Sequence, residues 1–536
     1  MTRRTFVFAA AALAAAALLP APAAAQCQTD KVVADVQQAF SRFGRAVALS
    51  GNRLVVGAPD AKPAGLGQRG LAYVYHHDAT GWTFEAQLKA SDGAAFDEFG
   101  VAVAIDGDTI LVGADGVDSA QSGAMGRVYA FDLVGTQWVQ VQEFTATDAA
   151  SGGFFGFSVA LQGDTAVIGR FWDNAGAVHA GSAYVFRRSG GTWAQTQKLL
   201  HTAPAAEDDF GWSVALDGGR AVVGASERFS SGDGDPQFGR AFVYTEQAGS
   251  FVQTAVLAAT TPQEHDQFGI SVDIAGDEIV VGAWQDFFST VGSGNGEAFV
   301  FDWDGSVWQP TQKLVATDGS LQDEFGSGVA IQGDRLIVGA ASRFASFPLL
   351  GGVYAYQRVA GAFVQTALFL PDPSGSANWL GNAVAMDGNA AVAGAFIESV
   401  GVTQGGSAYT FGGLQAWTDL GAGLAGAAGV PSLLGTGTLC AGQADQLTLG
   451  GAAPSAAATL VFGLSVIDAP FKGGTLVPTP LLLLGLPTDA SGAATLPFTL
   501  PAGIPPDTEL DFQVWVPDAG GPHGLAASNG LRGVTP

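Results

Sequence analysis

The stretch DEFGVAVAIDGDTILVGAD, residues Asp97–Asp115, is written again with few changes as DEFGSGVAIQGDRLIVGAA, residues Asp323–Ala341. Each copy contains a Phe-Gly pair, an alternating apolar segment, a two-residue turn and a second apolar segment. Two short apolar segments joined by a Gly-Asp turn are typical of a β-hairpin. Because the copies lie more than two hundred residues apart, they indicate an internal repeat that spans much of the chain.

The repeat occurs seven times, at intervals of 55 to 58 residues. Its first marker is the pair at Phe43, Phe99, Phe155, Phe210, Phe268 and Phe325, with Leu380 in the seventh copy. In every copy a second glycine follows the first after thirteen residues, and two further strands complete the unit. An aromatic residue follows the third strand and precedes the fourth, and in the last copy this residue is taken to be Trp417. Four antiparallel strands per repeat, closed radially, predict an all-β fold with a seven-bladed β-propeller over residues 26–417.

The start of the mature chain predicts how this ring closes. TDKVVAD (Thr29–Asp35) aligns without gaps with TQKLVAT (Thr311–Thr317), which is a fourth-strand sequence. The stretch TDLGAGLAG after Trp417 is interrupted by glycine and is a poor strand. We therefore expect the N-terminal segment to complete the seventh blade.

Composition and charge restrict the class of protein. The chain has 536 residues, 48% of them hydrophobic, and a formal net charge of -26, which disfavours nucleic acid as a partner. Residues 1–25 carry two early arginines and an alanine-rich apolar run, which predicts a cleavable export signal that resembles the twin-arginine form, and a secreted or cell-surface location. No later segment has about 20 consecutive apolar residues, so no membrane span is predicted.

At these residues the sequence resembles the FG-GAP repeat, the unit of the integrin α-subunit propeller and of many secreted bacterial proteins. The resemblance implies extracellular adhesion or ligand recognition. Family members often bind calcium in an Asp-rich loop of the first hairpin, but here that loop is reduced to two-residue turns such as those at Asp108 and Asp164. Calcium takes about six or more oxygen ligands, and such short turns offer fewer. We predict no metal and no cofactor, and interpret these acids as turn formers.

Catalytic motifs are not evident. The six histidines occupy non-equivalent positions of the repeat, and acid pairs such as Asp97 and Glu98 recur before the Phe-Gly pair as part of the repeat. We therefore predict no catalytic residue and no enzyme activity. Two carboxylates, or a histidine with a carboxylate, at the mouth of the central channel would instead favour an enzyme.

The loops between the second and third strands carry all the length variation, and they emerge on one face of the propeller together with the loops that join successive blades. The candidate ligand residues on this face are Arg170, Trp172, Asp173, Trp284, Asp286, Phe287 and Phe344. Aromatic rings beside carboxylates suit a glycan or a protein partner. The alternative is that these rings pack the loops against the blades.

The composition changes near Val430, where charge falls and proline increases. We predict a linker at 418–429 and a small β-sandwich domain at 430–536. Cys27 and Cys440 are the two cysteines of an exported chain, which predicts a disulfide between them; otherwise each is buried separately or pairs elsewhere.

Three functions agree with these observations. The first is a monomeric, non-enzymatic recognition or adhesion protein that presents a propeller face to a glycan or protein ligand. The second is an enzyme that acts on polysaccharide at that face or in the central channel. The third is an architectural component of the cell surface.

Overall fold

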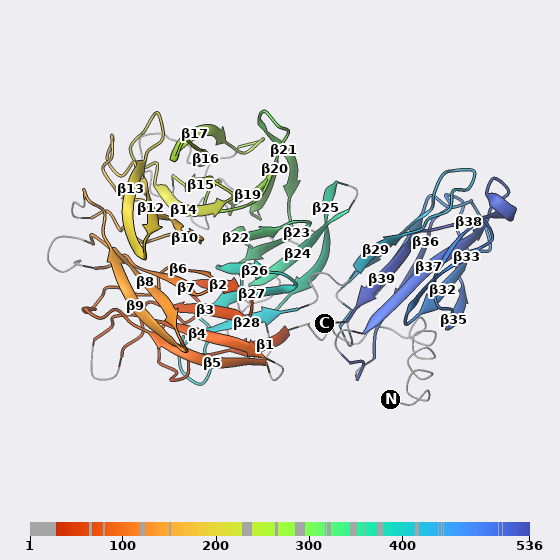
Figure 1. The fold of residues 1–536 in the computed structure, drawn as a ribbon, viewed down its shortest axis with the longest axis horizontal. Helices are drawn as coiled ribbons and strands as arrows, with labels where there is room; N and C mark the ends of the chain where they lie inside the picture. Colours follow the sequence, from red (N-terminus) through yellow and green to blue (C-terminus); the bar gives the residue numbers. More distant parts are fainter. Residues whose placement is uncertain are drawn as a thin grey trace. The chain divides into compact units, whose positions relative to one another are not determined.

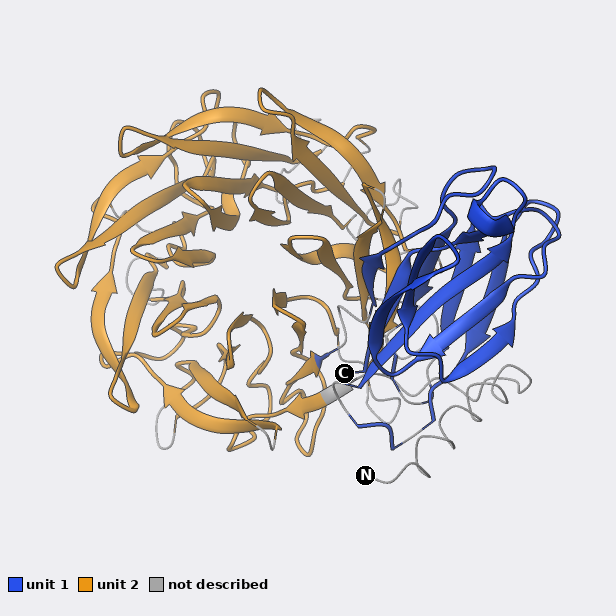
Figure 2. Cartoon of the chain, turned by 45° about the vertical axis from the view of Figure 1, so that its right-hand side comes forward, with its two compact units in different colours: residues 1–27, 411–536 blue, residues 28–410 orange. Residues whose placement is uncertain are grey.

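The computed structural model describes residues 28–535 except 64–66, 79–80, 118–123, 149–151, 228–237, 263–265, 285–294, 317, 319–322, 343–350, 360, 372–378, 413–416, 438, 441, 443, 502 and 506–507. The chain divides into a repeat unit (Gln28–Thr410) and a C-terminal unit that includes Phe411–Pro536 (Figures 1 and 2). The described residues form strands and turns, with one 3₁₀ helix, Pro522–Gly524. None of their helices is long and apolar enough to cross a membrane.

The described part of the repeat unit contains seven four-stranded antiparallel sheets. The first three consist of β2 (Val47–Ser50), β3 (Arg53–Ala58), β4 (Leu71–Asp78) and β5 (Gly81–Leu88); β6 (Val103–Asp106), β7 (Thr109–Ala114), β8 (Arg127–Val134) and β9 (Gln137–Phe144); and β10 (Val159–Gln162), β11 (Thr165–Arg170), β12 (Ser182–Ser189) and β13 (Thr192–Leu199). The next three consist of β14 (Phe210–Asp217), β15 (Arg220–Ala225), β16 (Arg240–Gln247) and β17 (Ser250–Leu257); β18 (Ser271–Ala275), β19 (Glu278–Ala283), β20 (Glu297–Trp303) and β21 (Trp308–Leu314); and β22 (Phe325–Gln332), β23 (Arg335–Ala340), β24 (Gly352–Val359) and β25 (Ala362–Phe369).

The seventh sheet combines the two ends of the repeat unit. It contains β26 (Val384–Asp387), β27 (Ala390–Ala395) and β28 (Ser407–Phe411), and its outer strand is β1 (Gln28–Val32). Lys31 Nζ lies 2.6 Å from the buried Glu398 Oε1, which joins β1 to the loop after β27. The prediction that the N-terminal segment completes this sheet is confirmed.

Glycine pairs determine how closely neighbouring sheets approach, and Figure 2 shows the sheets of the repeat unit arranged in a ring. A Cβ on Gly57 would lie 1.9 Å from the carbonyl oxygen of Gly100 in the next sheet. The equivalent contact joins the seventh sheet to the first, since a Cβ on Gly394 would lie 1.8 Å from the carbonyl oxygen of Gly44. Within the first sheet the Gly44 N–H donates to the Gly57 carbonyl at 3.0 Å. Gly57 also lies against Gly100 of the next sheet, and Gly44 lies against Gly394 of the seventh. This hydrogen bond and these two backbone contacts account for the constant spacing of thirteen residues between the two glycines.

A second set of contacts joins the hairpin turns of adjacent sheets. In six of the seven sheets the last side chain of the first strand accepts a hydrogen bond from the turn glycine of the next sheet, as Asp106 does from Gly163 at 2.6 Å. Asp387 accepts from Gly51 at 2.5 Å, again from the seventh sheet to the first. The turn residue Asp108 lies 3.1 Å from the guanidinium of Arg53 in the preceding sheet. This turn acid therefore also pairs with a neighbouring sheet.

The C-terminal unit has its own core. Its largest sheet has the order β29-β39-β37-β32-β35, with β38 paired to β37, and smaller sheets are β30-β31-β36 and β33-β34. These strands are β29 (Trp417–Gly421), β30 (Ser432–Thr436), β31 (Asp445–Gly450), β32 (Thr459–Gly463), β33 (Val466–Phe471), β34 (Gly474–Pro478), β35 (Leu482–Gly485), β36 (Ala494–Phe498), β37 (Glu509–Pro517), β38 (Leu525–Ala527) and β39 (Gly530–Val534).

The interpretation of Trp417 as the last aromatic of the repeat is wrong. Trp417 begins β29, pairs with Gly533 of β39 and is buried in the core of the C-terminal unit beside Phe512, with ring centroids 5.8 Å apart. The predicted linker at 418–429 therefore begins with strand residues. Pairing with β39, more than a hundred residues away, stabilises a segment whose local sequence is poor for a strand.

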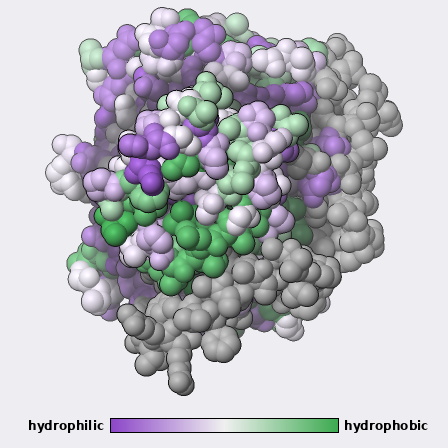
Figure 3. Space-filling view, turned by 90° about the vertical axis from the view of Figure 1, so that its right-hand side faces the viewer, coloured by the Kyte–Doolittle hydropathy of each residue, from purple (hydrophilic) through white to green (hydrophobic). Residues whose placement is uncertain are grey.

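Apolar side chains also lie on the surface of the C-terminal unit, where Val430, Ile467, Phe471, Leu481 and Leu483 are exposed. Figure 3 shows hydrophobic residues gathered on one face of the molecule. Cys440 is buried and disulfide-bonded. Cys27, the other cysteine of the chain, lies outside the described residues, so its pairing with Cys440 stays a prediction.

Candidate functional site: the mouth of the central channel

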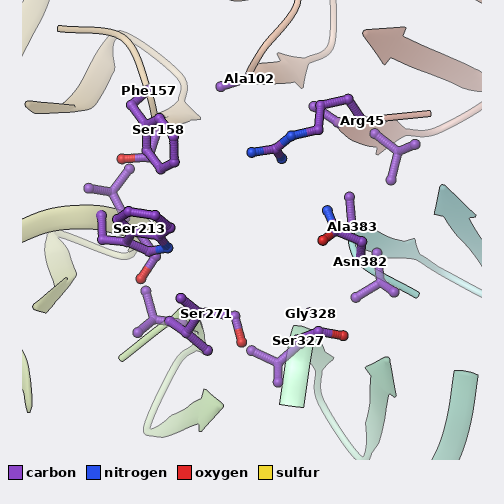
Figure 4. A pocket seen from close by; sticks show the side chains of 18 of the residues that line it. Arg45, Ala102, Phe157, Ser158, Ser213, Ser271, Ser327, Gly328, Asn382 and Ala383 are labelled. Atoms are coloured by element: carbon purple, nitrogen blue, oxygen red, sulfur yellow. The ribbon is translucent and has the colours of Figure 1, made fainter. Parts of the chain in front are cut away.

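One cavity, of about 260 Å³, lies where all seven sheets of the repeat unit meet (Figure 4). The residue after each Phe-Gly pair contributes to its wall, together with Trp284 and neighbouring residues of the first strands. These residues are Arg45, Val101, Phe157, Trp212, Ile270, Ser327 and Asn382. The site therefore combines one equivalent position from every repeat.

A tight turn directs these side chains toward the axis. The N–H of Arg45 donates to the Arg42 carbonyl at 3.0 Å, and the N–H of Trp212 donates to the Asp209 carbonyl at 3.1 Å. The residue before the pair is in the left-handed region in all seven copies, with φ between 50° and 59°. Since this backbone is common to the repeats, the chemistry of the cavity depends on which side chain follows the glycine.

Aromatic rings form one side of the mouth. The Phe157 ring lies 4.7 Å from Trp212 and 4.6 Å from Phe171, measured between centroids. Phe154 and Trp172 continue the contact, with centroids 5.4 Å apart. We call these five residues the aromatic cluster. Of these, Phe157 and Trp212 line the cavity and offer apolar ring faces to a ligand next to polar groups.

The opposite side of the mouth is polar. Arg45 and Asn382 lie there, and the Arg45 guanidinium points across the cavity toward Phe157 and Ser158 (Figure 4). The charge of Arg45 acts on two nearby acids. Burial, and secondarily Asp60, raises the pKa of Glu98, and burial with the charge of Glu98 raises the pKa of Asp115 to about 8, although Arg45 opposes both shifts.

Deeper along the axis, the first strands line a second cavity. Six sheets place an alanine at the equivalent wall position, whereas the fifth places Asp273 there. Its carboxylate accepts hydrogen bonds from the N–H groups of Ile274 at 2.9 Å and Ile331 at 2.8 Å. Burial is the main reason that the pKa of Asp273 rises to about 7.

The raised pKa values predict a pH dependence of stability. Between about pH 4 and 8 the folded protein holds protons on Asp115 and Asp273 that the unfolded chain releases, so their contribution to stability is full below pH 4 and is lost as pH rises toward 7 and 8. We expect Asp115→Asn to be more stable than wild type by about 1–2 kcal/mol at pH 8 and nearly equal to it at about pH 4. Urea unfolding at both pH values measures this difference; an equal effect at both would contradict it.

Two of the residues predicted to face a ligand do not. The Arg170 side chain is 1% exposed and lies 3.0 Å from Asp173, so both are internal. Asp173 also accepts a hydrogen bond from Ser182 at 2.7 Å and lies 2.6 Å from Lys198 Nζ. The larger side chain at 170, where most repeats have alanine, fills space beside Gly153, because a Cβ there would lie 2.0 Å from Arg170 Nε.

The other predicted residues divide into two groups. Trp172 belongs to the aromatic cluster, where its ring stacks on His179 at 4.6 Å, and Trp284 lines the cavity while donating to Gln267 at 2.7 Å. Asp286, Phe287 and Phe344 lie outside the described residues. Sequence reasoning missed Arg45, Phe157 and Trp212, although their shared position after the Phe-Gly pair was a usable signal.

These sheets, turns and glycine contacts define a β-propeller-like repeat protein. A comparison with protein families finds the FG-GAP repeat at residues 27–75, 82–131, 138–186, 193–244, 251–301 and 308–356, together more than half of the chain. The chain belongs to the FG-GAP repeat family. Of the sheet that has Leu380 in place of phenylalanine, strands β26, β27 and β28 lie outside the matched residues, whereas β1 lies within the first matched range. A comparison with curated proteins finds no match.

Proposed function

We propose that the seven sheets are the blades of one seven-bladed propeller, followed by a β-sandwich, in a protein exported to the cell surface or beyond. The equivalent glycine contacts from each sheet to the next, including that from Gly394 to Gly44, support a single closed ring. The signal-like sequence at residues 1–25 supports export.

We propose that this propeller recognises a glycan or protein ligand at the mouth of its channel, without catalysis. The observation that carries the proposal is the asymmetry of the mouth, which has Phe157 and Trp212 on one side and Arg45 with Asn382 on the other. A framework repeated seven times requires no such asymmetry for packing. Binding sites combine apolar ring faces with a few polar groups in this manner.

Binding of the full chain to immobilised glycans and proteins tests this proposal. Trp212→Ala is expected to weaken the ligand found by about tenfold or more, because an aromatic contact at the centre of a site contributes about 1.4 kcal/mol or more. Phe84→Ala removes a 44% exposed aromatic residue from the outer strand β5 and should leave binding unchanged. Equal losses in both variants, or none in Trp212→Ala, would reject the mouth as the site.

The acids beside Arg45 favour one second candidate, an enzyme acting on polysaccharide. Glu98 and Asp115 influence each other electrostatically near the mouth, and the pKa of Asp115, about 8, suits a proton donor at neutral pH. However, Asp115 is 4% exposed, which limits its contact with a substrate. Release of reducing ends from a polysaccharide, abolished by Glu98→Gln, would establish the enzyme. If neither binding nor turnover is found, an architectural role remains.

A further inference from the structure

The cavity at the channel mouth has a cationic lining, whereas the chain as a whole has an excess of acidic residues. Among the described residues that line it, Arg45 is the one charged side chain, and no acid is present. The whole chain carries 49 acidic and 23 basic residues. A cationic lining in a protein with this excess of acid favours an anionic ligand group at this place.

The position of Arg45 suits a carboxylate. Its guanidinium points into the cavity (Figure 4), where its planar donors match the two oxygens of a carboxylate. Glu98 and Asp115 act on Arg45 but do not line the cavity. They therefore do not occupy the space of the ligand.

The opposite wall suits a sugar ring. Phe157, Trp212 and Trp284 present aromatic rings to the same cavity. Three serine hydroxyls of the wall, in contrast, donate to carbonyls of the next sheet: Ser158 to Gly211, Ser213 to Gly269 and Ser271 to Gly326, each at 2.8 Å. These hydroxyls are therefore already hydrogen-bonded within the protein. Recognition of a peptide terminus depends on a row of backbone donors and acceptors. A sugar ring can instead pack against the faces of the aromatic rings.

The size and enclosure limit how much of a ligand enters. The cavity of about 260 Å³ is slightly below the roughly 300–1,000 Å³ typical of ligand pockets, so it holds about one ring-sized group. All seven sheets surround it. A cavity of this size suits the end group of a polymer.

We propose that the channel mouth binds the terminal uronic acid of an acidic polysaccharide, with Arg45 holding the carboxylate and Trp212 contacting the sugar ring. This inference rests on the proposed recognition function and names its ligand class. Asn382 lies on the same wall as Arg45 and supplies an amide to the hydroxyls of the sugar.

Titration calorimetry of the full chain tests this inference with three probes: a short oligogalacturonide, the same oligosaccharide with its carboxyl groups reduced to alcohols, and a short peptide with a free C-terminus. Wild type is expected to bind the acidic sugar at least about tenfold more tightly than the reduced one. Arg45→Gln should bind both sugars equally, and Arg45→Lys, which keeps the charge without the planar fork, should fall between the two. Arg220→Gln, an arginine paired with Asp277 elsewhere on the ring, is the matched control and should keep the wild-type ratio.

The outcomes separate the two proposals. Wild-type binding of the reduced sugar as tightly as the acidic one, or of the peptide alone, overturns the uronic acid assignment while recognition at the mouth stands. Retention of the wild-type ratio by Arg45→Gln also overturns it. If the wider panel of glycans and proteins gives no binding at all, recognition itself fails. Thermal unfolding of each variant is measured first, and Arg45→Lys decides the matter if Arg45→Gln does not fold.

Discussion

Replacing Gly113 with alanine is expected to destabilise the repeat unit by about 3–5 kcal/mol, a large part of the stability of a typical domain. A Cβ at this position would lie 2.0 Å from the carbonyl oxygen of Gly156 in the next sheet. The obstacle is backbone, so no side-chain rotation can relieve it, and the two sheets must separate. Urea unfolding followed by tryptophan fluorescence measures the loss.

The matched control is Gly107→Asn. Gly107 has φ of +55°, a Cβ added there would meet no atom within 4 Å, and asparagine tolerates this conformation. We expect a loss of about 1 kcal/mol or less. If Gly113→Ala unfolds at the same urea concentration as this control, close approach of the sheets is not what requires glycine at the repeated position.

Deleting residues 26–34 is expected to have the second large effect, with loss of cooperative unfolding and rapid proteolysis of the repeat unit. The deletion removes the partner of β28 and leaves that strand as an open edge. It also removes Lys31 from Glu398, a fully buried acid that accepts from Tyr409 at 2.8 Å. An uncompensated buried carboxylate alone costs about 3–5 kcal/mol.

The deletion also removes Cys27, so full-length Cys27→Ser is the control for the disulfide. We expect that variant to keep a folded repeat unit, because β1 still pairs with β28. Lys31→Met tests the ion pair separately from the strand, since methionine keeps much of the apolar length. A truncated protein as resistant to protease as Cys27→Ser would show that β1 does not hold the ring together.

Much of the architecture could be predicted because the same sequence features recur in seven copies of the repeat. A contact made once leaves little trace in one sequence, but the thirteen-residue glycine spacing appears in every copy. The closing strand could be predicted for the same reason, since its sequence matches other fourth strands. The spacing of Trp417 fits the repeat within one residue and so misplaces it, whereas its actual partner, Gly533, has no marker in the sequence.

The candidate site was predicted less well. Arg170 and Asp173 were predicted to face a ligand because they lie at the loops whose length varies between repeats. In the structure both side chains are buried and form an ion pair with each other. Arg45 and Trp212 lie in regular positions of the repeat, where side chains usually belong to the framework. Their shared position after the Phe-Gly pair was the signal that the sequence offered, but only the ring brings them to one cavity.

The sequence by itself determined the repeating unit, its four strands and the strand that closes the last sheet, because each is specified by local periodicity and spacing. Only the tertiary structure decided which side chains form the site. A ring brings one residue from each repeat to a common axis, so seven positions that are each unremarkable in their own repeat become one asymmetric cavity.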